Sequence, residues 1–301
     1  MFSKILFNQS RRRFSNNLKR FKGSNPWYYS PNKWKLFAFT TCFSAGFYFY
    51  SREEIPYLGK KRFIAISPST EKAIDLGKMT YNQVTARYRH QFLPKWHPIY
   101  RRIQSVADKL IQSLENDQRY SRDWQLFVID APIENAFVIP GGQIFVFTGL
   151  LRVATSDDEI AAVIGHEMSH VILRHPAQGI SLRILLGLAR IALDLTLGMG
   201  AFFDTLGTFG FMLPYSRLKS EKEADHVGLL IMSRACYDPN GAKMEKLKIG
   251  ASVPSLLATH PPHHERISFL NEKLAEANDL RRLHCNTEEF YQFDGLFSRF
   301  F

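Results

Sequence analysis

The run from His166 to His170 reads His-Glu-Met-Ser-His, and it limits the possible folds of this chain more than any other segment. Residues four positions apart lie on one face of an α-helix, so His166 and His170 are expected to offer two imidazole nitrogens to one metal ion. Neutral imidazoles suit zinc, and a catalytic zinc ion also needs a third protein ligand and a water molecule. Glu167 points toward the same cavity and is expected to accept a proton from that water.

Two solvated surface histidines, with Glu167 in a salt bridge between them, are the alternative interpretation of this run. Ser156 is a good N-cap residue, and Glu159 stands three positions later, as in a capping box. These residues predict a helix that begins at Ser156, carries the run, reaches about Arg174 and is stopped by Pro176. A capped and mostly apolar helix favours the metal site over the surface alternative.

The third metal ligand is expected on a second helix that faces the first, and the acidic cluster at 221–225 is the obvious source. Glu221 and Asp225 are four positions apart and share one helix face. One carboxylate is therefore expected to bind zinc, while the other accepts a hydrogen bond from a ligand imidazole. The spacing does not choose between Glu221 and Glu223 as the ligand. An exposed acidic helix turn is the alternative interpretation.

The chain after residue 60 predicts a mainly helical α+β domain with a small β-sheet. Apolar residues recur at helical spacing in some segments, whereas others are rich in Val, Ile and Phe and contain a Pro-Gly-Gly turn at 140–142. The expected helices cover 99–114, 216–234 and 264–277, and the expected strands cover 124–129 and 136–147.

Residues 180–213 are mostly apolar, but Arg183, Arg190, Asp194 and Asp204 interrupt them. These charges would be costly inside a membrane, so a simple second transmembrane span is not expected. A helical hairpin that lies on a membrane surface or over the active site tolerates them. We therefore predict a membrane-peripheral tract, with a buried lid or core element as the alternative.

Residues 1–30 have the composition of a mitochondrial transit peptide. Arg, Lys, Ser and Asn are frequent near the start, apolar residues are scattered among them, and no acidic residue occurs. A secretory signal needs a continuous apolar region, which this segment lacks. A disordered basic tail is the alternative.

Residues 36–50 contain no charged residue and are predicted to form a transmembrane anchor. Aromatic residues on both sides resemble the belts found at membrane interfaces. The segment is shorter than the roughly 20 residues of a usual span, so a core helix is the alternative. Positive charge is denser before the segment, at Lys33 and Lys35, than after it, at Arg52. The N terminus is therefore expected in the matrix and the rest of the chain in the intermembrane space.

Charge and cysteine content argue against two classes of protein. Residues 1–52 contain ten Lys and Arg and no acidic residue, which leaves 29 basic and 28 acidic residues downstream. The net charge of +11 is therefore concentrated at one end, and no nucleic acid is expected as a partner. Three cysteines, Cys42, Cys236 and Cys285, are too few for a disulfide framework, and their thiol state is left open.

Four segments occur in a set order between about residues 100 and 270. They are Asn-Ala-Phe-Val-Ile-Pro-Gly-Gly at 135–142, the zinc helix, Ser-Arg at 216–217 leading into 221–225, and Thr-His-Pro at 259–261 with Arg-Ile at 266–267. Together they resemble the HtpX-like and CAAX-prenyl-protease family of membrane-linked zinc peptidases. Residues 55–63 and the predicted transit peptide are similar to the mitochondrial inner-membrane members, whose activity overlaps that of the m-AAA protease.

The resemblance implies a zincin-like fold of the gluzincin type for residues 60–301, with one zinc ion per chain. It makes Glu221 the third ligand, because this residue is the first Glu of the pattern Glu-x-x-Ala-Asp. It also implies a metalloendopeptidase that cleaves misfolded or regulatory proteins of the inner membrane in quality control and stress. The expected partners are these substrates and the lipid bilayer, and homo-oligomer formation is left open.

The resemblance further implies a substrate-binding strand. The strand after Asn135, with Ala136 and Phe137, is expected to pair with the substrate backbone. A plain hairpin is the alternative.

Arg217 is expected to donate to the developing oxyanion or to pair with Asp225, and His260 is expected to line the cleft. Structural hydrogen bonds are the alternative for both residues. His175 and the other downstream histidines match no ligand pattern and are expected to be solvated or at helix ends.

A non-catalytic membrane scaffold with a structural metal site is the main alternative function. Such a site usually has a fourth protein ligand, often Cys, and no cysteine stands near either motif. The sequence therefore favours peptide hydrolysis by activated water. Glu167 takes the proton of the water, the water attacks a peptide carbonyl polarised by zinc, and Glu167 then protonates the leaving amine.

Overall fold

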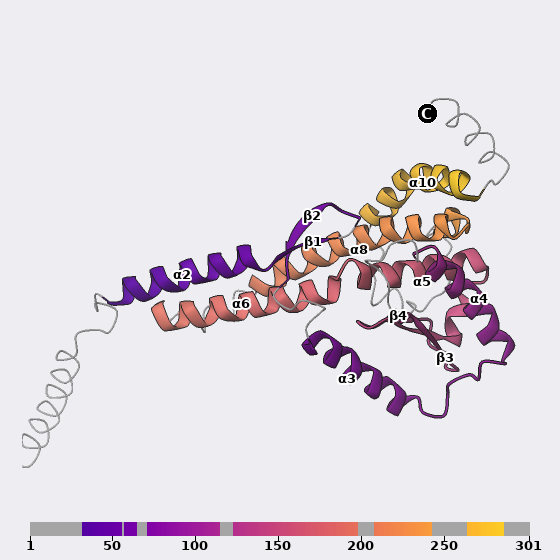
Figure 1. Cartoon of the computed structure of the whole chain (residues 1–301), viewed down its shortest axis with the longest axis horizontal. Coiled ribbons are helices and arrows are strands. Elements are labelled where there is room, and N and C mark those ends of the chain that lie inside the picture. Colours follow the sequence, from indigo (N-terminus) through magenta and orange to yellow (C-terminus); the bar gives the residue numbers. More distant parts are fainter. Residues whose placement is uncertain are drawn as a thin grey trace, which may run out of the picture. The chain divides into compact units, whose positions relative to one another are not determined.

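The structure is a computed structural model that describes residues 32–55, 57–64, 71–114, 123–197, 208–242 and 264–285 (Figure 1). The chain forms two compact units. The smaller unit comprises residues 1–51 and 183–208, and the larger unit comprises residues 52–182 and 209–301. The predicted transit peptide at 1–30 lies outside the described residues.

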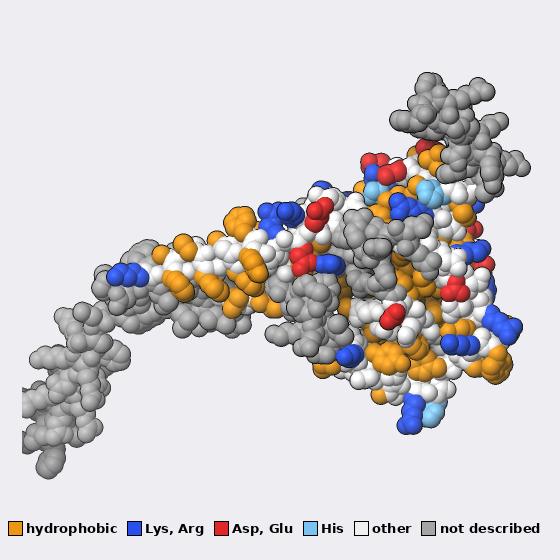
Figure 2. Space-filling view, in the orientation of Figure 1, with side chains coloured by type: hydrophobic (Ala, Val, Ile, Leu, Met, Phe, Trp, Pro, Cys, Tyr) orange, Lys and Arg blue, Asp and Glu red, His pale blue; other side chains and the backbone are white. Residues whose placement is uncertain are grey.

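The smaller unit contains helix α2 (Asn32–Tyr50) and the second half of α6 (His175–Leu197). The anchor predicted at 36–50 lies within α2. No helix within the described ranges combines the length and the apolar character that crossing a membrane requires. Large aromatic side chains are exposed along α2, where Figure 2 shows them in orange; they are Phe39, Phe43, Tyr48, Phe49 and Tyr50.

The larger unit contains a three-stranded sheet with the order β3-β5-β4. β3 (Gln125–Ile129) runs parallel to β5 (Gln143–Phe147), and β4 (Ala136–Val138) runs antiparallel to β5. Gly141 and Gly142 form the turn between β4 and β5, with φ angles of 130° and 96° that favour glycine. The strands and the turn expected from the sequence are thus confirmed.

Helix α5 (Asp157–Ile172) carries the His-Glu-Met-Ser-His run. The side chain of its N-cap Ser156 accepts a hydrogen bond from the Glu159 backbone, and the Glu159 carboxylate accepts one from the Ser156 backbone. This reciprocal pair confirms the predicted capping box. Arg174 lies beyond the end of α5 with a φ angle of 59°, and α6 starts directly afterwards. Pro176 therefore lies in the first turn of the next helix, where its fixed φ is favourable.

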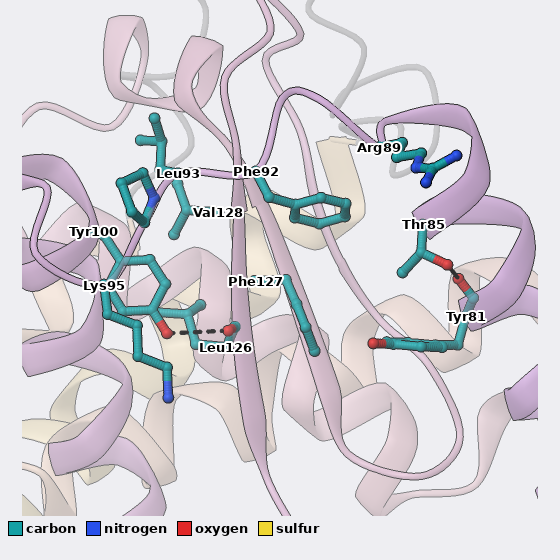
Figure 3. Close-up of a pocket in the computed structure, with 11 residues that line it drawn as sticks. Tyr81, Thr85, Arg89, Phe92, Leu93, Lys95, Tyr100, Leu126, Phe127 and Val128 are labelled. Atoms are coloured by element: carbon teal, nitrogen blue, oxygen red, sulfur yellow. Dashed lines mark hydrogen bonds between the residues drawn. The ribbon is translucent and has the colours of Figure 1, made fainter.

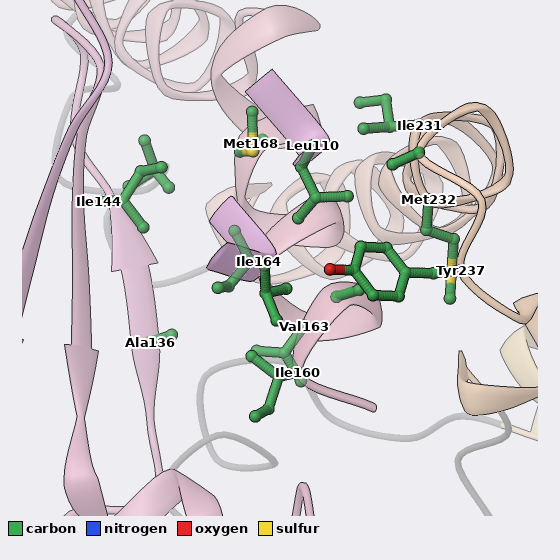
Figure 4. Packing of buried hydrophobic residues seen from close by; sticks show 14 of the residues in the cluster. Leu110, Ala136, Ile144, Ile160, Val163, Ile164, Met168, Ile231, Met232 and Tyr237 are labelled. Carbon is green, nitrogen blue, oxygen red and sulfur yellow. The ribbon is translucent and has the colours of Figure 1, made fainter. Parts of the chain in front are cut away.

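The core of the larger unit forms around α5, as Figure 4 shows. Ile160, Ile164 and Met168 of α5 have no exposed surface. Helix α4 (Pro98–Gln112), the sheet, and helix α8 (Thr208–Arg234) surround them. α8 begins earlier than the helix predicted at 216–234. The same hydrophobic cluster includes Leu110, Ala136, Ile144, Ile231, Met232 and Tyr237 (Figure 4).

The close approach of α5 and α8 depends on two glycines. A Cβ atom added at Gly228 would lie 3.1 Å from the backbone of His166, and one added at Gly165 would lie 3.3 Å from the Gly228 carbonyl oxygen. A side chain at either position would require the neighbouring backbone to shift by a few tenths of an ångström. Since α5 carries His166 and α8 carries Glu221, this contact decides how closely the predicted metal ligands approach.

A hairpin and a C-terminal helix complete the larger unit. Strand β1 (Arg52–Ile55) pairs antiparallel with β2 (Lys60–Phe63), which the sequence analysis did not anticipate. Helix α10 (His264–Cys285) is longer than the helix predicted at 264–277. A disulfide joins Cys285, at the end of α10, to Cys236, just after α8. The remaining described elements are α3 (Glu71–Arg87) and the 3₁₀ turns Thr148–Arg152 and Pro239–Ala242.

Candidate metal centre

Three predicted metal ligands converge between α5 and α8. The Nε2 atoms of His166 and His170 lie 3.1 Å apart, and the Glu221 carboxylate oxygens lie 3.4 Å from the first and 3.6 Å from the second. Tetrahedral zinc with bonds of about 2.0–2.1 Å requires donor atoms about 3.3 Å apart. The donor set and its spacing therefore fit one zinc ion with three protein ligands.

Glu221, and not Glu223, faces the two histidines. Glu223 instead contacts His175 and Arg62, on the other side of His170. The choice that the spacing left open is thus made by the way α8 packs on α5.

Glu167 follows His166 directly on α5 and is almost completely buried, with 5% of its surface exposed. A carboxylate held beside the metal donors and shielded from bulk water is suited to accept a proton from a water molecule in the site. Its placement agrees with the role of general base expected from the sequence.

The surroundings of His166 strongly favour positive charge. Burial lowers the pKa of His166, but hydrogen bonds to Asp225 and Glu221, together with the charge of Glu167, raise that pKa to about 10. A divalent cation satisfies the same negative field in place of the proton. The electrostatics of the cluster therefore also fit a metal ion.

Asp225 and Arg266 support the ligands from α8 and α10. The Asp225 carboxylate lies 3.0 Å from Nδ1 of His166. Arg266 donates to both oxygens of Asp225, at 2.8 and 2.7 Å, and lies 3.0 Å from the Glu221 carboxylate. Burial raises the pKa of Asp225, but the bonds to Arg266 and His166 hold it below its usual value. Arg266, with no exposed surface, thus orients two carboxylates at once.

The sequence analysis offered Arg217 as a partner of Asp225, which no described contact tests, and the structure shows Arg266 bonded to Asp225. The side chain of Arg217 and the whole of His260 lie outside the described residues, so their proposed catalytic roles stay predictions. Arg266 belongs to the fourth motif of the resemblance, but no spacing rule connects it with α8. Only the packing of α10 on α8 brings Arg266 and Asp225 together.

His175 is a second residue whose place the sequence did not indicate. It does stand at a helix end, as the first residue of α6, but it is buried rather than solvated. Its Nδ1 lies 2.8 Å from Nδ1 of His170. Burial lowers the pKa of His175 despite a hydrogen bond to Glu223, which favours a neutral ring.

The predicted substrate-binding residues lie on an open sheet edge beside α5. β4 packs against α5 and bonds to β5 through Asn135 and Ile139. Because the backbone groups of successive strand residues point to alternate edges, those of Ala136 and Val138 point to the other edge, where the Ala136 N–H donates to the Asn135 side-chain oxygen at 3.0 Å. Among the described strands none pairs with that edge. Phe137 stacks on Phe145 of β5 instead of reaching toward the metal cluster.

A cavity of about 400 Å³ lies at the opposite edge of the sheet, beside β3 (Figure 3). The ring of Phe127 lies between those of Phe92 and Tyr81, and the Tyr100 hydroxyl donates to the Leu126 carbonyl. None of the metal-site residues lines this cavity. It therefore does not belong to the candidate metal centre.

Comparison with known proteins gives a consistent result. Residues 100–274 match peptidase family M48. The mitochondrial metalloendopeptidase OMA1 of Schizosaccharomyces pombe is 36% identical over 242 residues, covering 77% of this chain and 69% of the relative. The Saccharomyces cerevisiae protein of the same name is 31% identical over 252 residues, covering 78% and 72%. The human mitochondrial metalloendopeptidase OMA1 is 30% identical over 278 residues, covering 85% and 52%.

Proposed function

The chain belongs to peptidase family M48 and is a metalloendopeptidase, and we propose that its metal ion is zinc, held by His166, His170 and Glu221. The observation that carries this proposal is the spacing of the donor atoms: the two Nε2 atoms lie 3.1 Å apart, one Glu221 oxygen lies 3.4 Å from His166 and the other lies 3.6 Å from His170, which suits tetrahedral zinc. A closed structural site would be expected to have a fourth protein ligand, and the described residues of the cluster supply three.

Each residue of the site has its own role in the proposed peptide hydrolysis. His166, His170 and Glu221 would hold the zinc ion, which would supply a Lewis acid that makes water more acidic and polarises the substrate carbonyl. Glu167 takes the proton from the attacking water and returns it to the leaving amine. Asp225 holds the Nδ1–H of His166, and Arg266 holds Asp225 and Glu221 in place.

We propose that the substrate binds as an added strand on β4. The backbone groups of Val138 and the carbonyl of Ala136 face the open edge, and β4 packs against the helix that carries Glu167. An extended peptide on this edge would run past the metal cluster, and its main-chain hydrogen bonds would not depend on its sequence. This arrangement suits a protease that accepts varied or misfolded substrates.

We assign the enzyme to mitochondria, as the names of its relatives indicate, and propose that it acts at the inner membrane on membrane proteins. The exposed aromatic side chains of α2 and the exposed Ile184 and Leu188 of α6 support attachment to a bilayer. The dense positive charge before residue 36 favours a catalytic domain in the intermembrane space. Protease added after rupture of the outer membrane should then digest the domain. A domain that is digested only after the inner membrane is opened would face the matrix.

The proposed chemistry is tested by the change Glu167→Gln in the full-length protein. This variant keeps all three ligands and should bind zinc as the wild type does, but its cleavage of a membrane-protein substrate should fall by at least about a hundredfold, because the general base is missing. Zinc content and cleavage rate are measured on the same preparation. Wild-type activity in this variant would refute the mechanism.

A further inference from the structure

We propose that His175 is a positioning residue for the metal ligand His170, and that the β1–β2 hairpin completes the support of this ligand through Arg62 and Glu223. The proposal rests on the zinc site proposed above and extends it outward along one chain of contacts.

The first contact fixes the orientation of His170. Its Nε2 faces the Nε2 of His166 at 3.1 Å and Glu221 at 3.6 Å, so its Nδ1 is the nitrogen that points away from the donor cluster. That Nδ1 lies 2.8 Å from Nδ1 of His175. An imidazole that gives Nε2 to a metal carries its proton on Nδ1. His170 therefore donates and His175 accepts.

The second contact fixes the form of His175. If its Nδ1 accepts, its proton lies on Nε2. This nitrogen lies 3.4 Å from the Glu223 carboxylate, which accepts. Only 8% of His175 and 13% of the Glu223 side chain are exposed, so little water is present to replace either partner. The two contacts together leave one arrangement of protons and one ring orientation.

The third contact brings in the hairpin. Arg62 of β2 forms an ion pair with Glu223 and donates a second hydrogen bond, of 2.8 Å, to Gln178 of α6. Glu53 of β1 forms an ion pair with Arg174, the residue between α5 and α6. The left-handed φ angle of 59° at Arg174 turns the chain so that His175 folds back onto His170. The hairpin thus contacts both the turn that places His175 and the carboxylate that orients it.

The two histidine ligands are supported by different partners. His166 contacts the carboxylate of Asp225 directly, and Arg266 of α10 holds that carboxylate. His170 contacts the imidazole of His175 instead. His175 in turn contacts the Glu223 carboxylate, which pairs with Arg62. The series of contacts from His166 ends at Arg266 in the C-terminal helix α10. The series from His170 ends at Arg62, on the hairpin that follows α2 in the sequence. Both ends of the catalytic domain therefore contribute to metal binding.

The test for His175 measures zinc binding by the full-length protein in detergent, in competition with a chelator of known affinity. His175→Phe should weaken zinc binding about 10–100-fold, because it keeps the volume but removes both hydrogen bonds. His175→Gln, whose amide offers an acceptor and a donor, should restore most of the affinity. Cobalt(II) in the site should show an altered visible absorption spectrum in the Phe variant. His90→Phe, at an exposed histidine, serves as the control.

Wild-type zinc affinity and an unchanged cobalt spectrum in His175→Phe would overturn the positioning role. Equal loss in the Phe and Gln variants, with equal loss of thermal stability before zinc is added, would show that His175 only fills space and would overturn it as well. A wild-type protein that binds zinc but cleaves no peptide would instead refute the proposed function.

The hairpin is tested with Arg62→Met, which should weaken zinc binding about tenfold. Arg52→Met is the matched control, because Arg52 lies on the same hairpin and bonds only to the exposed Lys61 carbonyl among the contacts described for it. Equal zinc affinity in the two variants would overturn the part of the proposal that concerns the hairpin.

Discussion

The larger and smaller units of this protein differ in what they bury: the larger unit buries charged side chains, whereas the smaller unit exposes large apolar ones. In the larger unit, charged side chains are buried with fixed partners: Arg266 has 0% exposure and is bonded to Asp225. In the smaller unit, apolar rings face outward, with 68% of Phe39 and 90% of Tyr50 exposed. Buried charge is stable only with its partners in place, whereas exposed apolar surface is stabilised by a partner outside the chain. The buried charges of the larger unit therefore find their partners within the unit, whereas the exposed rings of the smaller unit favour contact with an apolar partner outside it.

The largest effect is expected at the metal cluster of the larger unit. Glu221→Gln should lose zinc and abolish activity, because the amide no longer offers a charged ligand. Glu223→Gln keeps an acceptor for His175 and should lower zinc affinity by about tenfold or less. Zinc content after dialysis distinguishes the two. The reverse order would make Glu223 the third ligand.

A large effect on stability is expected from the disulfide. Cys236 and Cys285 are 49 positions apart, and closing a loop of this length restricts the unfolded chain by about 4 kcal/mol. Cys285→Ser should therefore lower the melting temperature of the larger unit clearly. Cys42→Ser, at the exposed free cysteine of α2, should leave it unchanged. Equal melting curves for the two variants would mean that the disulfide does not stabilise the fold.

Replacing one glycine in each unit by alanine should change stability by a smaller amount, with opposite signs in the two units. Gly228→Ala places a methyl group 3.1 Å from the His166 backbone and should destabilise the larger unit by about 1–3 kcal/mol. Gly187→Ala, in α6 with nothing within 4 Å, should stabilise its helix by about 0.5–1 kcal/mol. Urea unfolding of both variants checks the sign. A stabilised Gly228→Ala would show that α5 and α8 are not in tight contact.

The smallest effect is expected for Arg183, on the exposed part of α6. A protein lacking residues 1–52 should still float with anionic liposomes, more weakly at high salt, because α6 offers basic and apolar side chains. Arg183→Glu should weaken this binding about fivefold or more, since one basic residue near such a surface contributes about 1 kcal/mol. Arg190→Glu is expected to add to the loss. A shortened protein that never floats would favour a core element or lid for 180–213.

Much of the local structure was predictable because its signals lie close together in the sequence. The capping box at Ser156 and Glu159, the turn at Gly141 and Gly142, and the i, i+4 spacing of His166 and His170 each act within a few residues. The physics of capping, φ preference and helical periodicity then selects the element without reference to the rest of the chain.

The contacts that tune the metal cluster were not predictable in the same way. Arg62 lies 161 residues from Glu223, and Arg266 lies 41 residues from Asp225. No local rule connects such positions, since their meeting depends on how whole helices and a hairpin pack. The disulfide between Cys236 and Cys285 is of the same kind.

The sequence by itself predicted the helix that carries His166, Glu167 and His170, because one helical turn brings these groups together. It also predicted that a carboxylate from the 221–225 cluster lies near the two histidines. Only the tertiary structure decided that Glu221 faces the histidines, that Arg266 holds Asp225, and that His175 lies against His170. The physical reason is that helix rotation and close approach are set by packing, here through Gly165 and Gly228, which no single segment encodes.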